Sequence, residues 1–492
     1  MLSNFSRPSR RYQKRLAAIS FGHQFLLMKG FRSFTHALIA VCSVAVTVLS
    51  AEKLAPVPSP ASFVPSVGKL VIKDGDTLIF LGDSITGQCL YTQFIEDFFY
   101  TRFPKTRIHF HNAGTMGDRS ADSFERFDSD VAAYKPQYVS VLFGMNDGNF
   151  TDWQQPTFEV FQKDMTTLFD RIVGMGATPI PMTPTTFDSL PNKLNNRTQD
   201  PRDKDYNNVL GTYGTWVKEQ GKVRKIPVVD LYAPLMAATT ERRRVESDWT
   251  MIPDTVHPTA TGHVIMAAAF INDTAFCPPV SEVLITKKDN QWVANVGSGE
   301  LNELHGGETI TFTFKAQSLP WVLPPEAEEG RKLIPLAFKK PPQLSSEKLA
   351  VRTLPPGKYD LKIDGKSVGQ WTDTELAAGI NLGENPRTPQ YQQALHVALV
   401  NKRRNAMGEH PMRIDWAQLK AQRSILKQAE EANESAAKVE QAKKVFERFF
   451  EPNQKSISDY VTKSRDIEDE IYRTNTPEPR KYELSPVARG GK

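Results

Sequence analysis

The stretch TLIFLGDSITG, residues 77–87, decides how this chain folds. Residues 77–81 are an apolar run of the length of a buried strand, and the run ends at Gly82. Ser84 follows two residues later and is the one hydroxyl presented directly after the break. Because sites in parallel sheets form beyond the carboxyl ends of strands, we expect Ser84 to lie at such an edge.

The chain that follows alternates between strand-like and helix-like segments. Apolar runs of strand length occur at 107–114, 138–144, 178–184 and 225–231, and the segments between them have helical spacing of apolar residues. Strands that alternate with helices predict a parallel sheet covered on both faces. We therefore expect one α/β domain over residues 70–279.

The character of the sequence changes after residue 279. Residues 280–371 alternate apolar and polar residues between Gly and Pro turns, which predicts a small antiparallel β domain with a hairpin turn at Asp364-Gly365. Residues 372–475 are expected to be helical, and residues 476–492 to be a disordered tail. Trp292, Trp321 and Trp371 fall in the predicted β domain, where they could line a groove for a glycan.

The basic character of the chain belongs to its first residues. Residues 1–51 carry seven Lys and Arg and no acid, so the remainder of the chain, with the formal charge of +5 as a whole, is slightly acidic. This distribution indicates no nucleic-acid partner. The apolar run HALIAVCSVAVTVLSA, residues 36–51, is shorter than the roughly 20 residues of a membrane span. We expect 1–51 to be a secretory signal peptide, starting at Met1 or Met28, with an uncleaved anchor as the alternative.

Composition describes an ordinary globular protein, with 40% hydrophobic and 24% charged residues. Residues 52–69 are rich in Pro and Ser and are expected to form a linker. Beyond the leader only Cys89 and Cys277 remain, and two unpaired thiols are a simpler expectation than one bridge. No group of ligand residues has metal-site spacing and no glycine-rich phosphate loop is present, so neither a metal nor a nucleotide cofactor is implied.

A serine becomes a nucleophile when a neighbouring base takes its proton, and histidine is the base suited to neutral pH. His257 is the candidate, because Asp254 precedes it by three residues on the same predicted loop. A carboxylate so placed can hold the imidazole in the required tautomer. For the oxyanion hole we expect the backbone N–H groups of Ser84 and Gly114 and the side-chain amide of Asn146.

Four blocks in this order resemble the SGNH hydrolases, also called GDSL esterases: FLGDSIT (80–86), NAGTMGD (112–118), GMND (144–147) and DTVHP (254–258). The resemblance implies a flavodoxin-like three-layer α/β/α sandwich. It also implies Ser84 as nucleophile, His257 as base oriented by Asp254, and an oxyanion hole of Ser84, Gly114 and Asn146. No catalytic block is missing, although isoleucine follows the serine where the family name has leucine.

Other candidates have simpler interpretations. His263 at a helix start is expected to be a structural donor, and Asp83, Asp118 and Asp147 are expected to shape loops. Trp153 is either a sugar-stacking face or a core aromatic.

The resemblance and the leader together predict a secreted serine esterase that removes acyl groups, acetyl in the first place, from a carbohydrate. A lipase-like or lysophospholipid esterase is an alternative. An alternative of another class is a glycan-binding protein that works through its β domain. A small-molecule or glycan ester is the expected partner, with no nucleic acid and no stable membrane insertion after signal removal.

Overall fold

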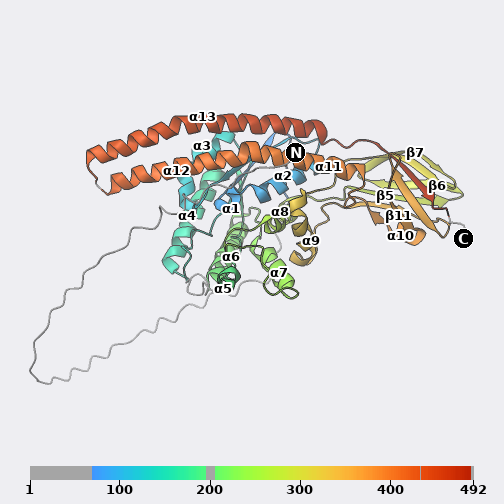
Figure 1. The fold of residues 1–492 in the computed structure, drawn as a ribbon, viewed down its shortest axis with the longest axis horizontal. Coiled ribbons are helices and arrows are strands. Elements are labelled where there is room, and N and C mark those ends of the chain that lie inside the picture. The colour runs from blue at the N-terminus through green and yellow to red at the C-terminus, as the bar shows by residue number, and fades with distance from the viewer. Residues whose placement is uncertain (1–68, 196–204, 433, 489–492) are drawn as a thin grey trace, which may run out of the picture. The chain divides into compact units, whose positions relative to one another are not determined.

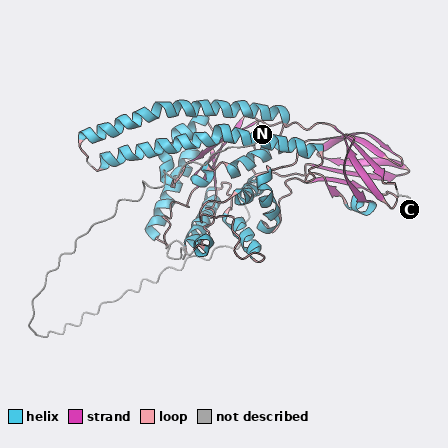
Figure 2. Ribbon diagram, in the orientation of Figure 1, coloured by secondary structure: helices cyan, strands magenta, loops and turns pink. Residues whose placement is uncertain are grey.

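The computed structural model describes residues 69–195, 205–432 and 434–488, so the predicted leader and nearly all of the linker lie outside the described residues. Figures 1 and 2 show an α/β region, a β region and a pair of long antiparallel helices, α12 and α13. Within the described ranges, no helix combines the length and the apolar character that a membrane crossing requires.

The α/β region is built on four parallel strands in the order β2-β1-β3-β4. Their bounds are β1 (Asp76–Gly82), β2 (Ile108–Gly114), β3 (Tyr138–Leu142) and β4 (Thr178–Pro181). The fifth expected strand contributes only an isolated parallel bridge between Val229 and Met182. Strand β1 lies between β2 and β3 and is almost wholly buried, as its continuous apolar run predicts.

Helices cover both faces of this sheet, which confirms the predicted three-layer α/β/α arrangement. Helix α2 packs against α8, and α4 packs against α6 through aromatic contacts such as that between Phe161 and Tyr213. The helices of this region are α1 (Ser84–Gly87), α2 (Leu90–Arg102), α3 (Phe127–Asp130), α4 (Gln155–Gly174), α5 (Leu190–Leu194), α6 (Tyr206–Arg224), α7 (Tyr232–Arg243) and α8 (Ala260–Thr274), with short 3-10 turns η2 (Ser120–Glu125) and η3 (Ala132–Tyr134).

The β region consists of two sheets, one ordered β11-β10-β13-β8-β7 and the other β12-β9-β5-β6. The strands are β5 (Ser281–Lys288), β6 (Gln291–Gly297), β7 (Gly299–Gly306), β8 (Ile310–Ala316), β9 (Glu347–Val351), β10 (Lys358–Ile363), β11 (Lys366–Thr372), β12 (Ile380–Asn381) and β13 (Arg480–Pro486). All pairs are antiparallel except β5 with β9. Asp364 and Gly365 both have positive φ between β10 and β11, which confirms the predicted hairpin turn.

Two boundaries differ from the sequence-based expectation. The tail expected to be disordered contains β13, which pairs on one side with β10 and on the other with β8, and which buries Tyr482 and Leu484. The segment that carries η5 (Pro325–Ala327) and α9 (Glu328–Ala337) lies within the predicted β domain but packs on the α/β core. Both differences arise because pairing partners far along the chain, rather than local pattern, decide where these segments pack.

Trp321 belongs to that displaced segment. It is 2% exposed and its indole N–H donates to the backbone carbonyl of Phe94 in α2 at 2.9 Å. Trp292 and Trp371 are partly buried against the separate core of the β region. The three tryptophans therefore do not line one groove, contrary to the expectation.

The C-terminal helices are α10 (Asp373–Ala378), α11 (Pro389–Arg404), α12 (His410–Glu431) and α13 (Ala436–Thr474), with a π-helical turn, η6 (Asn405–Glu409), between α11 and α12. Helices α12 and α13 pack side by side (Figure 1). Buried charges from η6 join this pair to β2, where Glu409 accepts the backbone N–H of Asn112 at 3.0 Å.

Candidate active site

Ser84 heads the short helix α1 at the carboxyl end of β1, as expected. Asp83 caps this helix, because its Oδ1 accepts the N–H of Ile85 at 2.9 Å. Gly82 lets the end of β1 lie close to β3, since a Cβ there would lie 2.8 Å from the carbonyl oxygen of Leu142. Ser84 is 5% exposed and is therefore largely shielded from water.

A continuous series of hydrogen bonds joins Ser84 to the loop before α8. The Ser84 Oγ lies 2.9 Å from Nε2 of His257, and Nδ1 of His257 lies 2.7 Å from Oδ2 of Asp254. The other carboxylate oxygen, Oδ1, accepts the backbone N–H groups of His257 at 2.7 Å and Val256 at 3.1 Å. Thr255 takes a left-handed conformation, φ +77°, which closes this tight loop.

These contacts set the charge on Asp254. Partial burial raises the pKa of the carboxyl group, but the hydrogen bonds from the backbone and ring of His257 and from the backbone of Val256 outweigh it, so the pKa lies below its ordinary value. Asp254 is therefore ionised at neutral pH, and its negative charge faces the ring nitrogen remote from Ser84.

Gly114, predicted to supply an oxyanion donor, has a different role. Its N–H donates to Oδ1 of Asn112 at 2.9 Å. A Cβ at Gly114 would lie 2.6 Å from the carbonyl carbon of Thr86 and closer still to the nitrogen of Gly87. Gly114 thus lets β2 approach α1, and its amide proton is already used inside the protein.

Gly117, which the sequence analysis did not single out, lies three residues after Gly114, in the turn that follows β2. It is exposed with φ +69°, and a Cβ there would meet no atom within 4 Å. The side-chain Nδ2 of Asn146 donates to the backbone carbonyl of the next residue, Asp118, at 2.9 Å. The turn that carries Gly117 and the predicted amide donor Asn146 are therefore adjacent. The second glycine of NAGTMGD was the sequence signal that could have found it.

The neighbouring acids hold loops, as expected. Burial raises the pKa of Asp83 to about 8. Asp147 accepts the N–H and the Oγ–H of Ser120 at 2.9 and 2.6 Å and the N–H of Gly144 at 2.9 Å. Asp118 binds Arg126 at 2.8 Å. These contacts fix the loops after β2 and β3 around the end of β1.

His263 is a structural residue. It is fully buried, its Nδ1 accepts the N–H of Tyr91 at 3.2 Å, and its Nε2 lies 2.9 Å from Oε1 of Gln88. Burial lowers the pKa of His263 to about 3, so the ring is neutral. Trp153 packs on Phe158, with ring centroids 4.9 Å apart, which favours a core role over sugar stacking.

Cys89 and Cys277 are both free thiols. Across the described part of the chain, no group of three or more His, Cys, Asp or Glu residues is arranged to hold a metal ion.

Comparison with known proteins shows what residues 80–265 are similar to. Residues 80–265 match the GDSL-like lipase/acylhydrolase family. An acetylxylan esterase of Geobacillus stearothermophilus is 25% identical over an alignment of 224 residues, which covers 42% of this chain and 96% of that protein.

A solved structure of a gut microbial diltiazem-metabolizing enzyme shares the fold more extensively. It superimposes with a TM-score of 0.72 at 23% identity, over 86% of this chain and all of that one. The shared fold thus extends beyond the 80–265 region. Together with the α/β/α architecture and the four sequence blocks, these matches show that residues 80–265 form an SGNH hydrolase domain of the GDSL-like lipase/acylhydrolase family, a family of carboxylic ester hydrolases.

Proposed function

We propose that this protein is a serine esterase that removes acetyl groups from a carbohydrate through an acyl-serine intermediate. The observation that carries the proposal is the hydrogen-bonded series Ser84–His257–Asp254 at the carboxyl end of β1. The acetyl and carbohydrate parts are supported by the acetylxylan esterase whose whole length, but for a few residues, aligns with this chain.

In the first half of the reaction, Nε2 of His257 takes the proton of Ser84 as Oγ forms a bond to the ester carbonyl carbon. Asp254 holds Nδ1 and stabilises the imidazolium that results. The carbonyl oxygen becomes an oxyanion, and we propose that the N–H of Ser84, the N–H of Gly117 and the amide of Asn146 donate hydrogen bonds to it. His257 then gives its proton to the alcohol oxygen as the bond between carbon and that oxygen breaks.

In the second half, a water molecule replaces the alcohol. His257 takes one proton of the water as its oxygen attacks the acyl carbon, and returns that proton to Ser84 Oγ as the acyl-serine bond breaks. The products are one carboxylic acid and one alcohol, and the enzyme is restored. No redox partner is needed.

The test is hydrolysis of p-nitrophenyl acetate, p-nitrophenyl octanoate and acetylated xylan by the wild-type, Ser84→Ala and His257→Ala proteins. His305→Ala is the matched control, because His305 is exposed on β7, far along the chain from the site. Acetate release from xylan that both site variants abolish and the control retains would support the proposal. Turnover of octanoate alone would replace it with the lipase-like alternative.

We further propose that the enzyme works outside the cytoplasm, because the apolar run at 36–51 follows a basic segment and precedes a Pro- and Ser-rich stretch. Mass spectrometry of the exported protein tests this. A first residue near position 51 would support signal removal, whereas an intact leader in the cytoplasmic fraction would contradict it.

A further inference from the structure

Helix α12 reaches the loop that follows β2. The Nζ of Lys420 lies 2.6 Å from Oδ1 of Asp118 and 3.1 Å from Oδ2 of Asp122. Lys420 and Asp118 are 302 residues apart in sequence. The contact therefore joins the C-terminal helices to the turn that carries Gly117.

Asp118 is the centre of this contact. It is fully buried, and its second carboxylate oxygen accepts Nε and Nη2 of Arg126 at 3.0 and 2.8 Å. Burial raises the pKa of the Asp118 carboxyl, while Arg126 and Lys420 favour its charged form. The backbone carbonyl of the same residue holds the amide of Asn146 at 2.9 Å. The two cations that fix the Asp118 side chain thus also restrict the carbonyl that orients Asn146.

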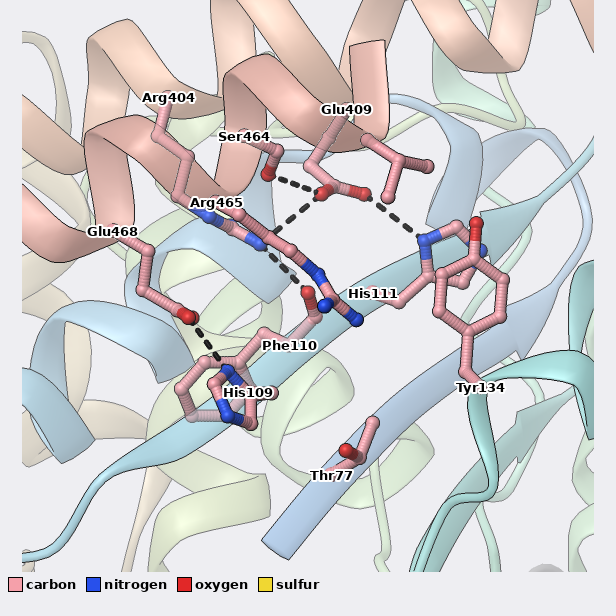
Figure 3. Close-up of a pocket in the computed structure, with 11 residues that line it drawn as sticks. Thr77, His109, Phe110, His111, Tyr134, Arg404, Glu409, Ser464, Arg465 and Glu468 are labelled. Carbon is pink, nitrogen blue, oxygen red and sulfur yellow. Dashed lines mark hydrogen bonds and ion pairs between the residues drawn. The ribbon is translucent and has the colours of Figure 1, made fainter. Parts of the chain in front are cut away.

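The contact is built on a firmly anchored helix pair. Arg413, two turns before Lys420 on α12, binds both oxygens of Asp130 at 2.8 and 3.0 Å, and both residues are buried. Figure 3 shows the neighbouring anchor, in which Glu409 faces His111 of β2 and accepts from Arg404 and Ser464. Because these pairs are buried, moving α12 away from the loop after β2 would leave buried charges without their partners, which is costly.

We propose that Lys420 is a positioning residue for ester hydrolysis at Ser84, acting through Asp118 on the amide of Asn146. The inference rests on the proposed function, since it assigns Asn146 to the oxyanion. An oxyanion donor contributes most when it is fixed before the reaction begins. On the side of Asp118 that faces α12, Lys420 supplies the positive charge that balances the carboxylate. Because Asp118 is buried, this ion pair is screened less by water than an ordinary surface pair. The C-terminal helices are then part of the catalytic apparatus rather than an independent module.

The experiment compares Lys420→Met, which keeps the apolar stem, with Lys420→Arg, which keeps the charge. Lys427→Met is the matched control, because Lys427 is exposed on the same helix and pairs with the exposed Glu431 at 3.9 Å. We expect kcat on p-nitrophenyl acetate to fall roughly 10- to 100-fold in Lys420→Met. KM should stay within about twofold, because the oxyanion exists only after the ground state. Lys420→Arg should recover most of kcat, and Lys427→Met should match the wild type.

Thermal unfolding of each variant accompanies the kinetics. Should Lys420→Met unfold below the assay temperature, Lys420→Gln takes its place with the same expected loss. An unchanged kcat, a loss confined to KM, or an equal loss in Lys427→Met overturns the role of Lys420.

Labelling by a fluorophosphonate separates this inference from the proposed function, because it reports Ser84 reactivity without a chosen ester. A wild-type protein that stays unlabelled overturns the esterase assignment and the role of Lys420 with it. Labelling that is fast in the wild type and equally fast in Lys420→Met overturns only the role of Lys420. Labelling that slows about tenfold or more in Lys420→Met supports it.

Discussion

Glu347 is a buried acid beside the last strand, and its titration gives a quantitative prediction of how the stability of the protein depends on pH. Its side chain, on β9, is 3% exposed, and Oε1 accepts Nε2 of Gln390 at 2.9 Å. The same Nε2 lies 3.2 Å from the hydroxyl of Tyr482 in β13. Oε2 of Glu347 and Oε1 of Gln390 are both buried acceptors without a partner in the described part of the chain. Because Oε2 accepts no hydrogen bond among the described residues, nothing there offsets the burial of a carboxylate charge, and the site favours the neutral carboxyl group.

The pKa gives the size of the effect. Burial raises the pKa of Glu347 from 4.5 to about 7. Between these values the folded state keeps a proton that the unfolded state has released, so the free energy of unfolding falls as the pH rises through this window. Above about pH 7 the loss is complete and amounts to about 3 kcal/mol.

Replacing Glu347 with Gln removes this titration and supplies an N–H where the proton would be. We therefore expect the variant to be more stable than the wild type by about 3 kcal/mol at pH 8 and to differ little at pH 4.5. If roughly 400 residues unfold together, at about 2.1 cal/mol/K per residue, the difference in Tm at pH 8 is about 4 °C.

Scanning calorimetry at pH 4.5, 6 and 8 measures this difference, with Glu300→Gln as control because Glu300 is exposed on β7. The control should track the wild type at every pH. A Tm difference that is independent of pH, or a wild type that gains on Glu347→Gln as the pH rises, would refute the reasoning.

Three further predictions concern the site and the fold. Asp254→Asn should lower kcat by about 10²- to 10⁴-fold with KM little changed, because the carboxylate that holds Nδ1 of His257 is lost. Steady-state kinetics on p-nitrophenyl acetate measure both constants, and a shift in KM alone would contradict the orienting role of Asp254. Gly114→Ala should destabilise the protein by several kcal/mol, because its Cβ would overlap the backbone of α1. The Cβ of Gly117→Ala meets open space, so this variant should lose only the roughly 1–2 kcal/mol that a positive φ costs an alanine. Urea unfolding compares the two variants, and equal losses of stability would contradict these different roles of the two glycines. A chain that ends at Asn475 lacks β13 and should lose the cooperative unfolding of the β region, because β13 lies between β8 and β10. Near-ultraviolet circular dichroism and thermal melting measure this loss. An unchanged spectrum and melting curve would show that the strand is dispensable.

The sequence by itself determined the features that depend on neighbours in the chain. The apolar run before Gly82 predicts the buried strand, and the three-residue interval between Asp254 and His257 lets one loop hold carboxylate and imidazole together, as the structure shows. The alternation of strand and helix patterns predicts the parallel sheet of the α/β region, and Asp364-Gly365 predicts the hairpin between β10 and β11 in the β region. Each of these follows from backbone conformation and side-chain periodicity over a few residues.

Only the tertiary structure decided the features that depend on distant segments. Gly114 and Gly117 look equivalent in NAGTMGD. In the structure α1 approaches β2 so closely that a Cβ at Gly114 would clash with it, whereas a Cβ at Gly117 would meet no atom within 4 Å. The pattern of residues 480–486 reads as tail because its partners, β8 and β10, lie more than a hundred residues earlier. The contact of Lys420 with Asp118 has no local signature at all. Such pairings depend on which buried surfaces and charges are complementary in the compact chain. A local sequence pattern does not contain this information.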